Sequence, residues 1–344
     1  MTSNIPGSRL LPSIFTRINP PKQPVDMPGS FLNPVHDDYK YDPDKHIPDL
    51  SSKVIIVTGG NNGIGKAAVT ELAKHNPKRL YMTARSRSKY DTAMKDVRAA
   101  APTAKVDFLE VDLASFASIK HAADEVIANN DQLDILINNA GVMGLPPHPT
   151  TKEGYEIHLG TNHMGHALLT KLLTPLLLST ASRPNSDVRV VTLSSGAHNM
   201  ASSGVSIDKI ATPMEGTWSY TRYGQSKMAN VLFARELARR YPQFTSVSAD
   251  PGRVQTPLLD EKFKTRDLTT YFQKTFDFFA GMLNVREGAY TELWCATFDK
   301  TKVKTGEHYV PFGHLVPGHK KSRDEKHARE LWEFQETEFK KHGY

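Results

Sequence analysis

The sequence predicts an α/β protein in which a single large domain is doubly wound around a parallel sheet. Short apolar runs alternate with longer helical stretches from residue 53 to about residue 250. The first apolar run ends in a cluster of glycines, and a chain of 344 residues has room for one large domain with extensions. Alternating strands and helices are typical of βαβ units, which place their strands in a parallel sheet.

Residues 1–50 differ in composition from the rest of the chain and contain nine of its 22 prolines. Proline lacks the N–H group that a helix needs, so we expect little regular structure in this N-terminal Pro-rich extension. Its start is free of acidic residues and, with Arg9 and Arg17, resembles a mitochondrial transit peptide. The prolines interrupt the amphipathic helix of such a peptide, which makes organelle import the less favoured interpretation.

Residues 51–320 carry the alternating pattern and are expected to form the domain. Composition predicts strands at 54–58, 79–84, 106–111, 133–138, 188–193 and 245–249. Helices are predicted at 64–75, 89–101, 116–129, 155–178 and 223–240. Residues 321–344 are expected to form a C-terminal amphipathic helix. The apolar residues of that helix recur among charged ones and are Leu331, Trp332, Phe334 and Phe339.

The first predicted strand leads into a glycine-rich turn, TGGNNGIG at residues 58–65. Glycine has no Cβ and tolerates positive φ, so the backbone can turn tightly and approach a ligand closely. The helix start behind the turn offers unpaired N–H groups and the positive end of a dipole, both of which favour phosphate. The first interpretation is therefore a dinucleotide cofactor. The residues expected to bind it here are Gly59, Asn62, Gly63, Ile64 and Gly65.

The same stretch allows two other interpretations. Residues 60–66 satisfy the GxxxxGK part of a P-loop, the nucleotide-binding turn of many ATPases and GTPases. A P-loop next requires Ser or Thr, whose hydroxyl holds Mg²⁺, and this chain has Ala67 there. A glycine turn without any ligand stays open on this stretch alone.

Polar side chains also follow the later predicted strands. Asp112 follows the third strand, NNAG at residues 138–141 ends the fourth, and Ser194-Ser195 ends the fifth. The carboxyl ends of parallel strands meet at one edge of a sheet, where ligands bind. A carboxylate at Asp112 is suited to hydrogen-bond an adenine amino group, and the small residues of NNAG suit close backbone approach.

Tyr223 and Lys227 are four residues apart on a predicted helix and therefore share a face. A phenol with a pKa near 10 is a poor base at neutral pH, but a neighbouring ammonium favours the phenolate. Tyr223 is then suited to exchange a proton with an alcohol or carbonyl oxygen that Ser195 also hydrogen-bonds. An ordinary exposed Tyr–Lys pair has the same spacing, so this pair gains meaning only beside the other motifs.

Together these motifs resemble the short-chain dehydrogenase/reductase family, whose fold is a Rossmann domain. The matches follow the family's order over about residues 53–315. They are TGGNNGIG at 58–65, Asp112, NNAG at 138–141, Asn162 in TNHMG, Ser195 in VTLSSGAH, YGQSK at 223–227 and PGRVQT at 251–256. Within the family the sequence is most similar to retinol-dehydrogenase-like and WW-domain-oxidoreductase-like members and to their fungal relatives. The gap between Ser195 and Tyr223 and the stretch NVREGAYTELWCAT resemble that subgroup.

The resemblance implies a catalytic role for four residues. Tyr223 would be the general acid/base, and Lys227 would lower its pKa and bind the nicotinamide ribose. Ser195 would polarise the substrate oxygen. Asn162 would hold a water molecule in a proton relay that runs through Lys227.

The resemblance also implies further cofactor contacts. Asn139, Ala140 and Gly141 would lie along the adenosine side of the cofactor. Pro251 would lie beside the cofactor, and Thr256 would contact its carboxamide. Two residues depart from the family pattern: Thr192 stands where many members have Asn, and Arg253 stands in a usually apolar stretch, where it could alter the substrate mouth.

Cofactor choice depends on the end of the second strand. NAD enzymes place a carboxylate there to bind the ribose hydroxyls, whereas this chain has Ala84-Arg85-Ser86-Arg87. Arg85 can pair with a 2′-phosphate, and Ser86 can donate a hydrogen bond to it. The sequence therefore predicts NADP(H) as the cofactor, with NAD the less favoured alternative.

The expected function is reversible hydride transfer between NADP(H) and an alcohol/carbonyl pair. Residues 257–284 are rich in aromatic side chains, which suggests a small apolar substrate such as a retinoid, a steroid, a lipid aldehyde or a secondary metabolite. These aromatic residues are Tyr271, Phe272, Phe276, Phe278 and Phe279. The alternative is a catalytically inactive dinucleotide-binding scaffold, although such proteins typically lose the Tyr, Lys or Ser that this chain keeps.

Two rival sites are weaker. A serine hydrolase using Ser195 and His198 lacks the GxSxG turn around its nucleophile. His158, His163 and His166 cluster in the sequence, but no nearby Asp, Glu or Cys completes a ligand set, so no metal is expected.

Composition limits the partners. The 43 basic and 37 acidic residues are mostly interleaved, so no nucleic-acid partner is expected. No apolar run reaches the roughly 18 residues that span a membrane, and the single Cys295 excludes an internal disulfide framework. The expected location is cytoplasmic. A lipid-droplet or membrane surface, reached by peripheral contact, and mitochondria are the alternatives, and both a monomer and a homodimer stay open.

Overall fold

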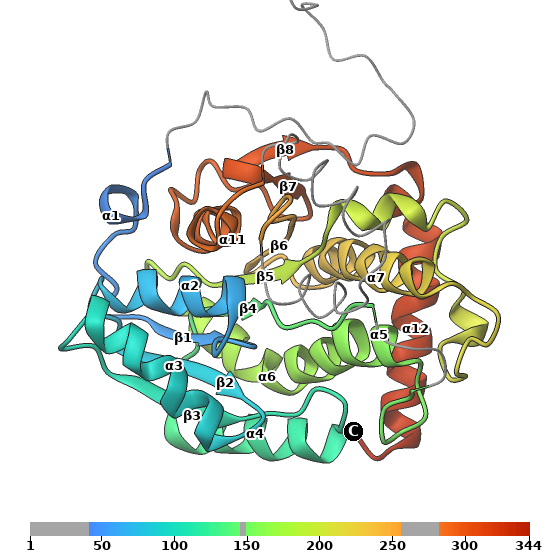
Figure 1. The fold of residues 1–344 in the computed structure, drawn as a ribbon, viewed down its shortest axis with the longest axis horizontal. Coiled ribbons are helices and arrows are strands. Elements are labelled where there is room, and N and C mark those ends of the chain that lie inside the picture. Colours follow the sequence, from blue (N-terminus) through green and yellow to red (C-terminus); the bar gives the residue numbers. More distant parts are fainter. Residues whose placement is uncertain (1–40, 145–148, 256–281) are drawn as a thin grey trace, which may run out of the picture. The chain divides into compact units, whose positions relative to one another are not determined.

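The computed structural model of the chain describes residues 41–144, 149–255 and 282–344. Their centre is an eight-stranded sheet in the order β3-β2-β1-β4-β5-β6-β7-β8 (Figure 1). Neighbouring strands are parallel except for β7 and β8. The strands are β1 (Val54–Val57), β2 (Arg79–Ala84), β3 (Val106–Glu110), β4 (Ile135–Asn138), β5 (Arg189–Leu193), β6 (Thr245–Ala249), β7 (His308–Val310) and β8 (His314–Val316). This confirms the predicted α/β fold class.

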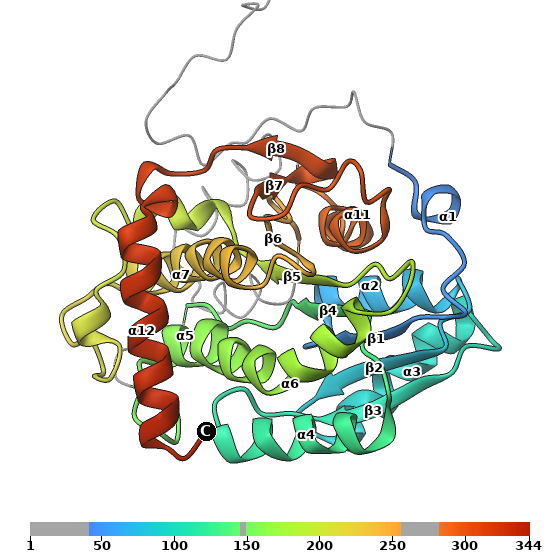
Figure 2. The same ribbon diagram turned by 180° about the vertical axis from the view of Figure 1, so that it is seen from behind.

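Helices cover both faces of the sheet (Figures 1 and 2). One face carries α2 (Gly63–Ala73), α3 (Arg87–Ala100) and α11 (Tyr290–Thr297). The other carries α4 (Phe116–Asn129), α6 (Gly165–Ala181) and α7 (Ser219–Arg240). The remaining helices and helical turns are α1 (Pro43–His46), α5 (Ile157–Leu159), η1 (Gly160–Met164), η2 (Gly196–Met200), η3 (Ile207–Lys209), α10 (Val285–Gly288), η5 (Pro311–Gly313), η6 (Lys320–Arg323) and α12 (Glu325–Lys341).

All six predicted strands are present, with ends that differ by two residues at most. The sequence did not predict β7 and β8, because each has only three residues and cannot show a clear alternation. The helix predicted at 155–178 is divided into α5, the π-helix η1 and α6. Apolar spacing alone does not reveal the wider turn of a π-helix.

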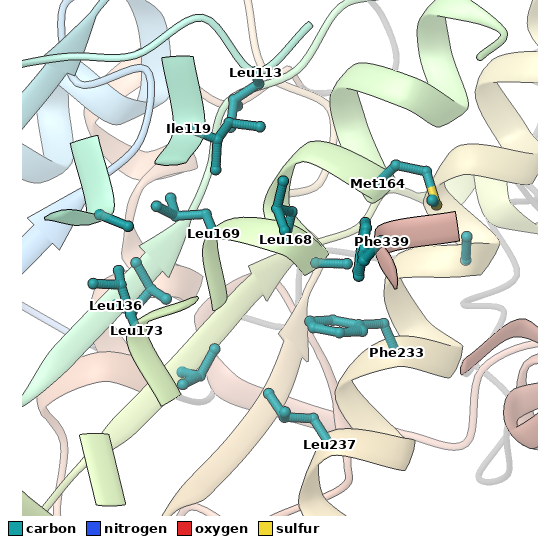
Figure 3. Packing of buried hydrophobic residues seen from close by; sticks show 14 of the residues in the cluster. Leu113, Ile119, Leu136, Met164, Leu168, Leu169, Leu173, Phe233, Leu237 and Phe339 are labelled. Atoms are coloured by element: carbon teal, nitrogen blue, oxygen red, sulfur yellow. The ribbon is translucent and has the colours of Figure 1, made fainter. Parts of the chain in front are cut away.

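The core on the α4, α6 and α7 face is closed by the C-terminal helix α12. Figure 3 shows Leu168, Leu169 and Leu173 of α6 between the sheet and the neighbouring helices, with Phe233 of α7 beside Phe339 of α12. Phe339 is fully buried. The helix predicted at the C-terminus is therefore an integral part of this layer.

Residues 41–50 pack on the opposite core, although the sequence assigned them to the extension. Tyr41, Ile47 and Leu50 are buried. The Tyr41 ring contacts those of Tyr290 and Phe298, with centroids 5.7 and 6.2 Å apart. Residues 41–50 are thus part of the packed domain, although the predicted boundary lies about ten residues later, at residue 51.

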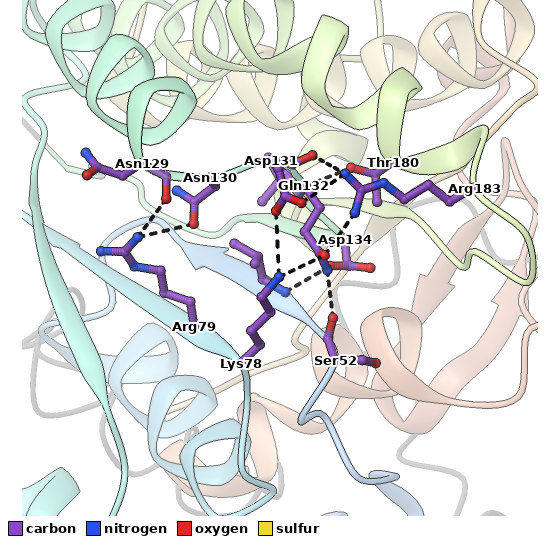
Figure 4. Close-up of polar contacts among 12 residues, drawn as sticks. Ser52, Lys78, Arg79, Asn129, Asn130, Asp131, Gln132, Asp134, Thr180 and Arg183 are labelled. Carbon is purple, nitrogen blue, oxygen red and sulfur yellow. Dashed lines mark hydrogen bonds and ion pairs between the residues drawn. The ribbon is translucent and has the colours of Figure 1, made fainter.

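A polar network ties together the amino ends of the central strands (Figure 4). The Asp134 carboxylate accepts hydrogen bonds from the backbone N–H of Val54 at 2.9 Å and from Gln132 Nε2 at 2.7 Å. Gln132 in turn accepts from Lys78 and Arg183, both at 3.1 Å. This edge of the sheet is filled by the chain's own side chains, so the candidate site must be sought at the carboxyl edge.

Chain direction across the sheet changes between β1 and β4. The chain runs outward from β1 through β2 to β3 and then returns to place β4 on the other side of β1. The point between β1 and β4 is therefore a topological switch point, and doubly wound sheets bind ligands outside the carboxyl ends of the strands at such a point. Within the described ranges, no helix combines the length and the apolar character needed to cross a membrane.

Candidate active site

The glycine turn after β1 depends on two glycines for different reasons. Gly59 has φ +64°, a left-handed conformation that side chains rarely adopt. A Cβ on Gly65 would lie 2.6 Å from the carbonyl oxygen of Gly59 and would also collide with the Asn139 side chain. The Asn62 side chain caps α2 by accepting from the N–H of Gly63 at 2.8 Å. The turn therefore brings the start of α2 close to the carboxyl edge, as phosphate binding requires.

Hydrogen bonds join this turn to the end of β4. Thr58 Oγ1 accepts from the backbone N–H groups of Asn139 at 2.9 Å and Ala140 at 3.0 Å. It also lies 2.8 Å from His166 Nε2. Burial lowers the pKa of His166 to about 3, so its ring is neutral and can accept the Thr58 proton. Asn139 and Ala140 are thus fixed beside the glycine turn by hydrogen bonds of their backbone.

The ends of β2 and β3 carry the residues predicted to face the adenosine. Arg85 is exposed directly after β2 and forms no ion pair with any residue in the ranges that the structure covers. Asp112 follows β3 and accepts from the N–H of Ala114 at 3.1 Å through Oδ1. The chain places a cation, and no carboxylate, at the end of β2.

Asn162 connects the loop after β4 to α7. Its Oδ1 accepts from the N–H of Val142 at 2.7 Å, and its Nδ2 donates to Ser226 Oγ at 2.9 Å. A Cβ on Gly141 would lie 3.4 Å from Asn162 Oδ1 and 3.5 Å from Lys227 Nζ. Asn162, Gly141 and Lys227 are therefore neighbours, and both polar atoms of the Asn162 side chain are engaged.

Tyr223, Lys227 and Ser195 are brought together by α7 and the loop after β5. Lys227 Nζ lies 5.8 Å from the centroid of the Tyr223 ring and donates to the Leu193 carbonyl at 3.0 Å. Ser195 forms a hydrogen bond with the Tyr223 side chain. Gly224 permits this approach, because a Cβ there would lie 2.6 Å from the Ala197 carbonyl oxygen.

Burial dominates the ionisation of this group. Tyr223 is only 7 % exposed, and burial raises its pKa to about 12, with the hydrogen bond to Ser195 opposing that shift. The sequence predicted the opposite direction from the charge of Lys227, and that prediction is wrong for the protein by itself. Burial also lowers the pKa of Lys227 to about 8, a shift that the charges of Asp250 and Glu292 partly offset.

Two buried carboxyl groups near Lys227 were missed by the sequence reasoning. Asp250 follows β6 and is 2 % exposed; burial raises its pKa to about 6. Glu292 on α11 is 1 % exposed, and burial raises its pKa to about 8. Among the residues that the structure describes, neither of its carboxylate oxygens has a hydrogen-bond partner. Asp250 could have been found as an acid at the carboxyl end of a predicted strand. Glu292 gave no such signal, because its helix lies far along the chain.

A buried ionic cluster lies next to Tyr223. The His158 ring meets the Tyr223 ring edge-on, with centroids 6.3 Å apart. His158 Nδ1 lies 2.7 Å from Glu156, which also accepts from Arg222 Nη1 at 2.8 Å. The sequence reasoning considered His158 only as a metal ligand and did not consider Glu156. In the covered ranges, no group of three or more His, Cys, Asp or Glu side chains is arranged to hold a metal ion.

The last predicted motif, PGRVQT at residues 251–256, is only partly covered by the structure. Pro251 is half-buried directly after Asp250. Thr256 and the aromatic residues between 257 and 281 lie outside the described residues. A cavity of about 470 Å³ elsewhere, between α6, α7 and α12, is lined by none of the predicted catalytic or cofactor-binding residues and is not the candidate site.

The carboxyl edge fits a dinucleotide: a glycine turn with no room for a Cβ, a capped helix start, and a Tyr–Lys–Ser group beyond it.

Residues 53–208 match the family profile described as short chain dehydrogenase. An Armillaria gallica short-chain dehydrogenase/reductase is 38% identical over 296 residues, covering 86% of this chain and 92% of that protein. Human retinol dehydrogenase 11 is 34% identical over 289 residues, covering 83% of this chain and 85% of that protein.

A solved structure shares the fold. The Pseudomonas aeruginosa RhlG/NADP active-site complex superimposes with a TM-score of 0.60 at 23% identity, over 76% of this chain and 95% of that one. The geometry of the edge and these matches lead to one conclusion. The chain belongs to the short-chain dehydrogenase/reductase family, with fungal and retinol-dehydrogenase relatives, and is an NAD(P)-dependent oxidoreductase that acts on a small molecule.

Proposed function

We propose that the protein interconverts an alcohol and a carbonyl on an apolar substrate, with NADP(H) as its cofactor and Tyr223 as its acid/base. The observation that carries this proposal is the meeting of Tyr223, Lys227 and Ser195 at the edge where the glycine turn lies. When bound, the nicotinamide supplies or accepts the hydride.

The side chains of this group account for the proton chemistry. During reduction, Tyr223 donates its phenolic proton to the substrate oxygen as negative charge develops there, while Ser195 donates a hydrogen bond to the same oxygen. Lys227 keeps positive charge near the phenolate that is left. A pKa of about 12 keeps Tyr223 protonated at neutral pH, which suits the reductive direction. Oxidation requires that this pKa fall when a positively charged nicotinamide is bound.

The proposed NADP(H) preference rests on Arg85. Its exposed guanidinium at the end of β2 is suited to pair with the 2′-phosphate of NADP. NAD has a hydroxyl in place of that phosphate. The RhlG relative was solved with NADP, which is consistent with this preference.

An apolar substrate is supported by the residues at the start of α7. Trp218 is 62 % exposed and lies one turn before Tyr223. Its ring contacts that of Tyr220, with centroids 4.7 Å apart. An exposed aromatic ring at the start of the helix that carries Tyr223 favours a substrate with an apolar body, and the human relative is named for retinol.

The test is a Tyr223→Phe substitution, assayed on a panel of apolar carbonyls and alcohols by NADPH fluorescence. We expect turnover to fall by at least about 100-fold, because general acid/base catalysis contributes that much or more, while NADPH affinity stays within about twofold. Tyr241→Phe, at the far end of α7, is the matched control and should keep wild-type turnover.

Two outcomes would reject the proposal. If Tyr223→Phe keeps wild-type kcat, Tyr223 is not the acid/base. If the wild-type protein binds NADPH but turns over no member of the panel, the protein is better explained as a dinucleotide-binding scaffold.

A further inference from the structure

His198 is a buried histidine to which the proposed function gives no role. It lies in η2, three residues after Ser195, and is 3 % exposed. The sequence suggested it only as the base of a serine hydrolase, which would have to meet the Ser195 hydroxyl. The structure places its ring against the Ser195 backbone, with Nδ1 2.7 Å from the carbonyl oxygen of Ser195. This contact is suited to hold Ser195 in place.

The hydrogen bonds of His198 define which of its ring nitrogens carries the proton. The backbone N–H of His319 donates to Nε2 at 3.3 Å, so Nε2 carries no proton. The carbonyl oxygen of Ser195 can only accept, so Nδ1 is the donor to it. Burial lowers the pKa of His198, which keeps the ring neutral and both hydrogen bonds intact at neutral pH. One tautomer therefore satisfies both nitrogens.

The bond from Nδ1 completes the turn that presents the Ser195 hydroxyl. The carbonyl oxygen of Ser195 also accepts from the backbone N–H of His198 at 2.9 Å, so both of its lone pairs are used. The hydroxyl of Ser195 accepts from the N–H of Ala197 at 3.2 Å, which leaves its own proton for donation. Because the side chain turns with the backbone, the direction of this hydroxyl depends on the turn.

The segment that precedes α12 packs against the other side of the His198 ring. Gly318 has φ +70°, and a Cβ there would lie 3.6 Å from His198 Nε2 and 2.9 Å from Ser322 Oγ. Ser322 is fully buried and donates to the His319 carbonyl at 2.7 Å, so His319 is held by a turn of its own. The His308 ring of β7 meets that of His198 edge-on, with centroids 5.1 Å apart. Segments far along the chain thus hold the ring.

We propose that His198 is a positioning residue that anchors the Ser195 backbone to the segment before α12, and so holds the Ser195 hydroxyl where it donates to the substrate oxygen beside Tyr223. This inference rests on the proposed function and adds the residue that sets the direction of the Ser195 hydroxyl. His198 acts through Ser195 and exchanges no proton with the substrate.

Two substitutions separate the two hydrogen bonds of His198. The amide of Asn is as far along the side chain as Nδ1, so His198→Asn can still donate to the Ser195 carbonyl. The amide of Gln lies one bond further out, as Nε2 does, so His198→Gln can accept from His319 but places no donor at Ser195. The full-length proteins are assayed for NADPH-dependent reduction of the panel carbonyl that the wild-type protein reduces fastest.

With His198→Gln, we expect kcat to fall about tenfold, the size of effect that follows loss of one hydrogen bond orienting a reacting group. NADPH affinity should stay close to that of wild type, and His198→Asn should keep most of the wild-type kcat. His121→Gln, the same substitution at an exposed position of α4, is the matched control and should keep wild-type kcat. Equal losses of kcat in the Asn and Gln variants would overturn the inference.

A double-mutant cycle tests whether His198 acts through Ser195. Ser195→Ala alone should lower kcat by about 100-fold, as removal of one donor to a developing oxyanion does. In that protein no hydroxyl remains to be misdirected, so adding His198→Gln should lower kcat by less than about twofold further. A full loss from His198→Gln in both backgrounds would show that it acts independently of the Ser195 hydroxyl and would reject the proposed role.

The tautomer of His198 can be observed without turnover, by nitrogen NMR of protein labelled at histidine. The His198 signals are assigned by their absence in His198→Asn, and the ring should be neutral with its proton on Nδ1 at neutral pH. A proton on Nε2 would overturn the role of His198 and leave the proposed function untouched. Wild-type kcat in Tyr223→Phe would overturn the proposed function and this inference with it, whichever nitrogen carries the proton.

Discussion

At the residue scale, buried ionisable side chains set the electrostatics of the site because water cannot stabilise their charges. Burial raises the pKa of Tyr223, Asp250 and Glu292 and lowers that of Lys227. At neutral pH, Lys227 is therefore mostly positive, Asp250 mostly negative, and Glu292 mostly neutral. The pair of opposite charges and the neutral phenol together define the resting state of the site.

Glu292 offers a test of this description through stability. An acid whose folded-state pKa is raised binds its proton more tightly when folded, so wild-type stability falls as pH rises from about 4.5 to about 8. Glu292→Gln cannot ionise and should lack that fall. We expect the variant to gain on wild type by at most about 1.4 kcal/mol per pH unit across this window, measured by urea unfolding.

Below pH 4.5 the Glu292→Gln and wild-type proteins should have similar stabilities. Glu333→Gln removes an exposed carboxylate on α12 and is the matched control, with no pH-dependent gain expected. A gain for Glu292→Gln that stays constant from pH 4.5 to pH 8 would mean that Glu292 does not titrate with a raised pKa.

At the element scale, α12 is built into the domain by apolar and polar contacts. The Phe339 ring meets that of Phe116 on α4, with centroids 5.5 Å apart, and Trp332 stacks on Phe233 of α7 at 5.7 Å. Glu336 pairs with Lys171 of α6, and Glu338 accepts from the Tyr155 hydroxyl at 2.8 Å. The helix therefore joins α4, α6 and α7 of the same layer and the segment just before α5.

Phe339→Ala should be strongly destabilising, because it removes a fully buried aromatic ring from a close-packed layer. We expect a loss of about 3–5 kcal/mol in the free energy of unfolding. Lys340→Ala, at the neighbouring exposed position, should change stability by less than about 0.5 kcal/mol. Guanidinium unfolding of both variants checks this, and similar stabilities for the two would show that α12 is only loosely attached.

At the scale of the whole molecule, the fold separates two edges of one sheet. The amino edge is filled by the network around Asp134 and Gln132, whereas the carboxyl edge collects the residues that follow β1, β4, β5 and β6. Residues from 58 to 250 reach the site in this way, because parallel strands all end on the same side. A ligand bound across that edge should stabilise the entire domain.

Cofactor preference can therefore be measured as stability. A ligand at 100 times its Kd adds about 2.7 kcal/mol to the free energy of unfolding, which raises Tm by several degrees. We expect NADPH to raise Tm more than NADH does at equal concentration. Arg85→Ala should remove this difference, and Arg98→Ala, at the far end of α3, should retain it. Equal shifts with both cofactors in the wild-type protein would contradict the proposed preference.

Much of this arrangement could be predicted from local sequence. The strands β2 and β6 and the helix α4 have the predicted bounds, because composition, periodicity and capping residues agree there. Gly59 and Gly65 were identified in the same way, since a glycine-rich turn between strand and helix has few physical interpretations. The short strands β7 and β8 and the π-helix η1 were not predicted, because tertiary pairing determines them and local preference does not.

The sequence by itself determined the fold class, the glycine turn, the Tyr223–Lys227 spacing and the cation at Arg85, since each follows from residues close together in the chain. Only the tertiary structure decided the ionisation of Tyr223, because burial, which depends on segments far apart in sequence, is the largest cause of its raised pKa. It also decided that Asp250 and Glu292 are buried near Lys227, although they lie 23 and 65 residues beyond it in the chain. Electrostatic interactions in a protein interior depend on distance in space and on exclusion of water, and neither can be read along the chain.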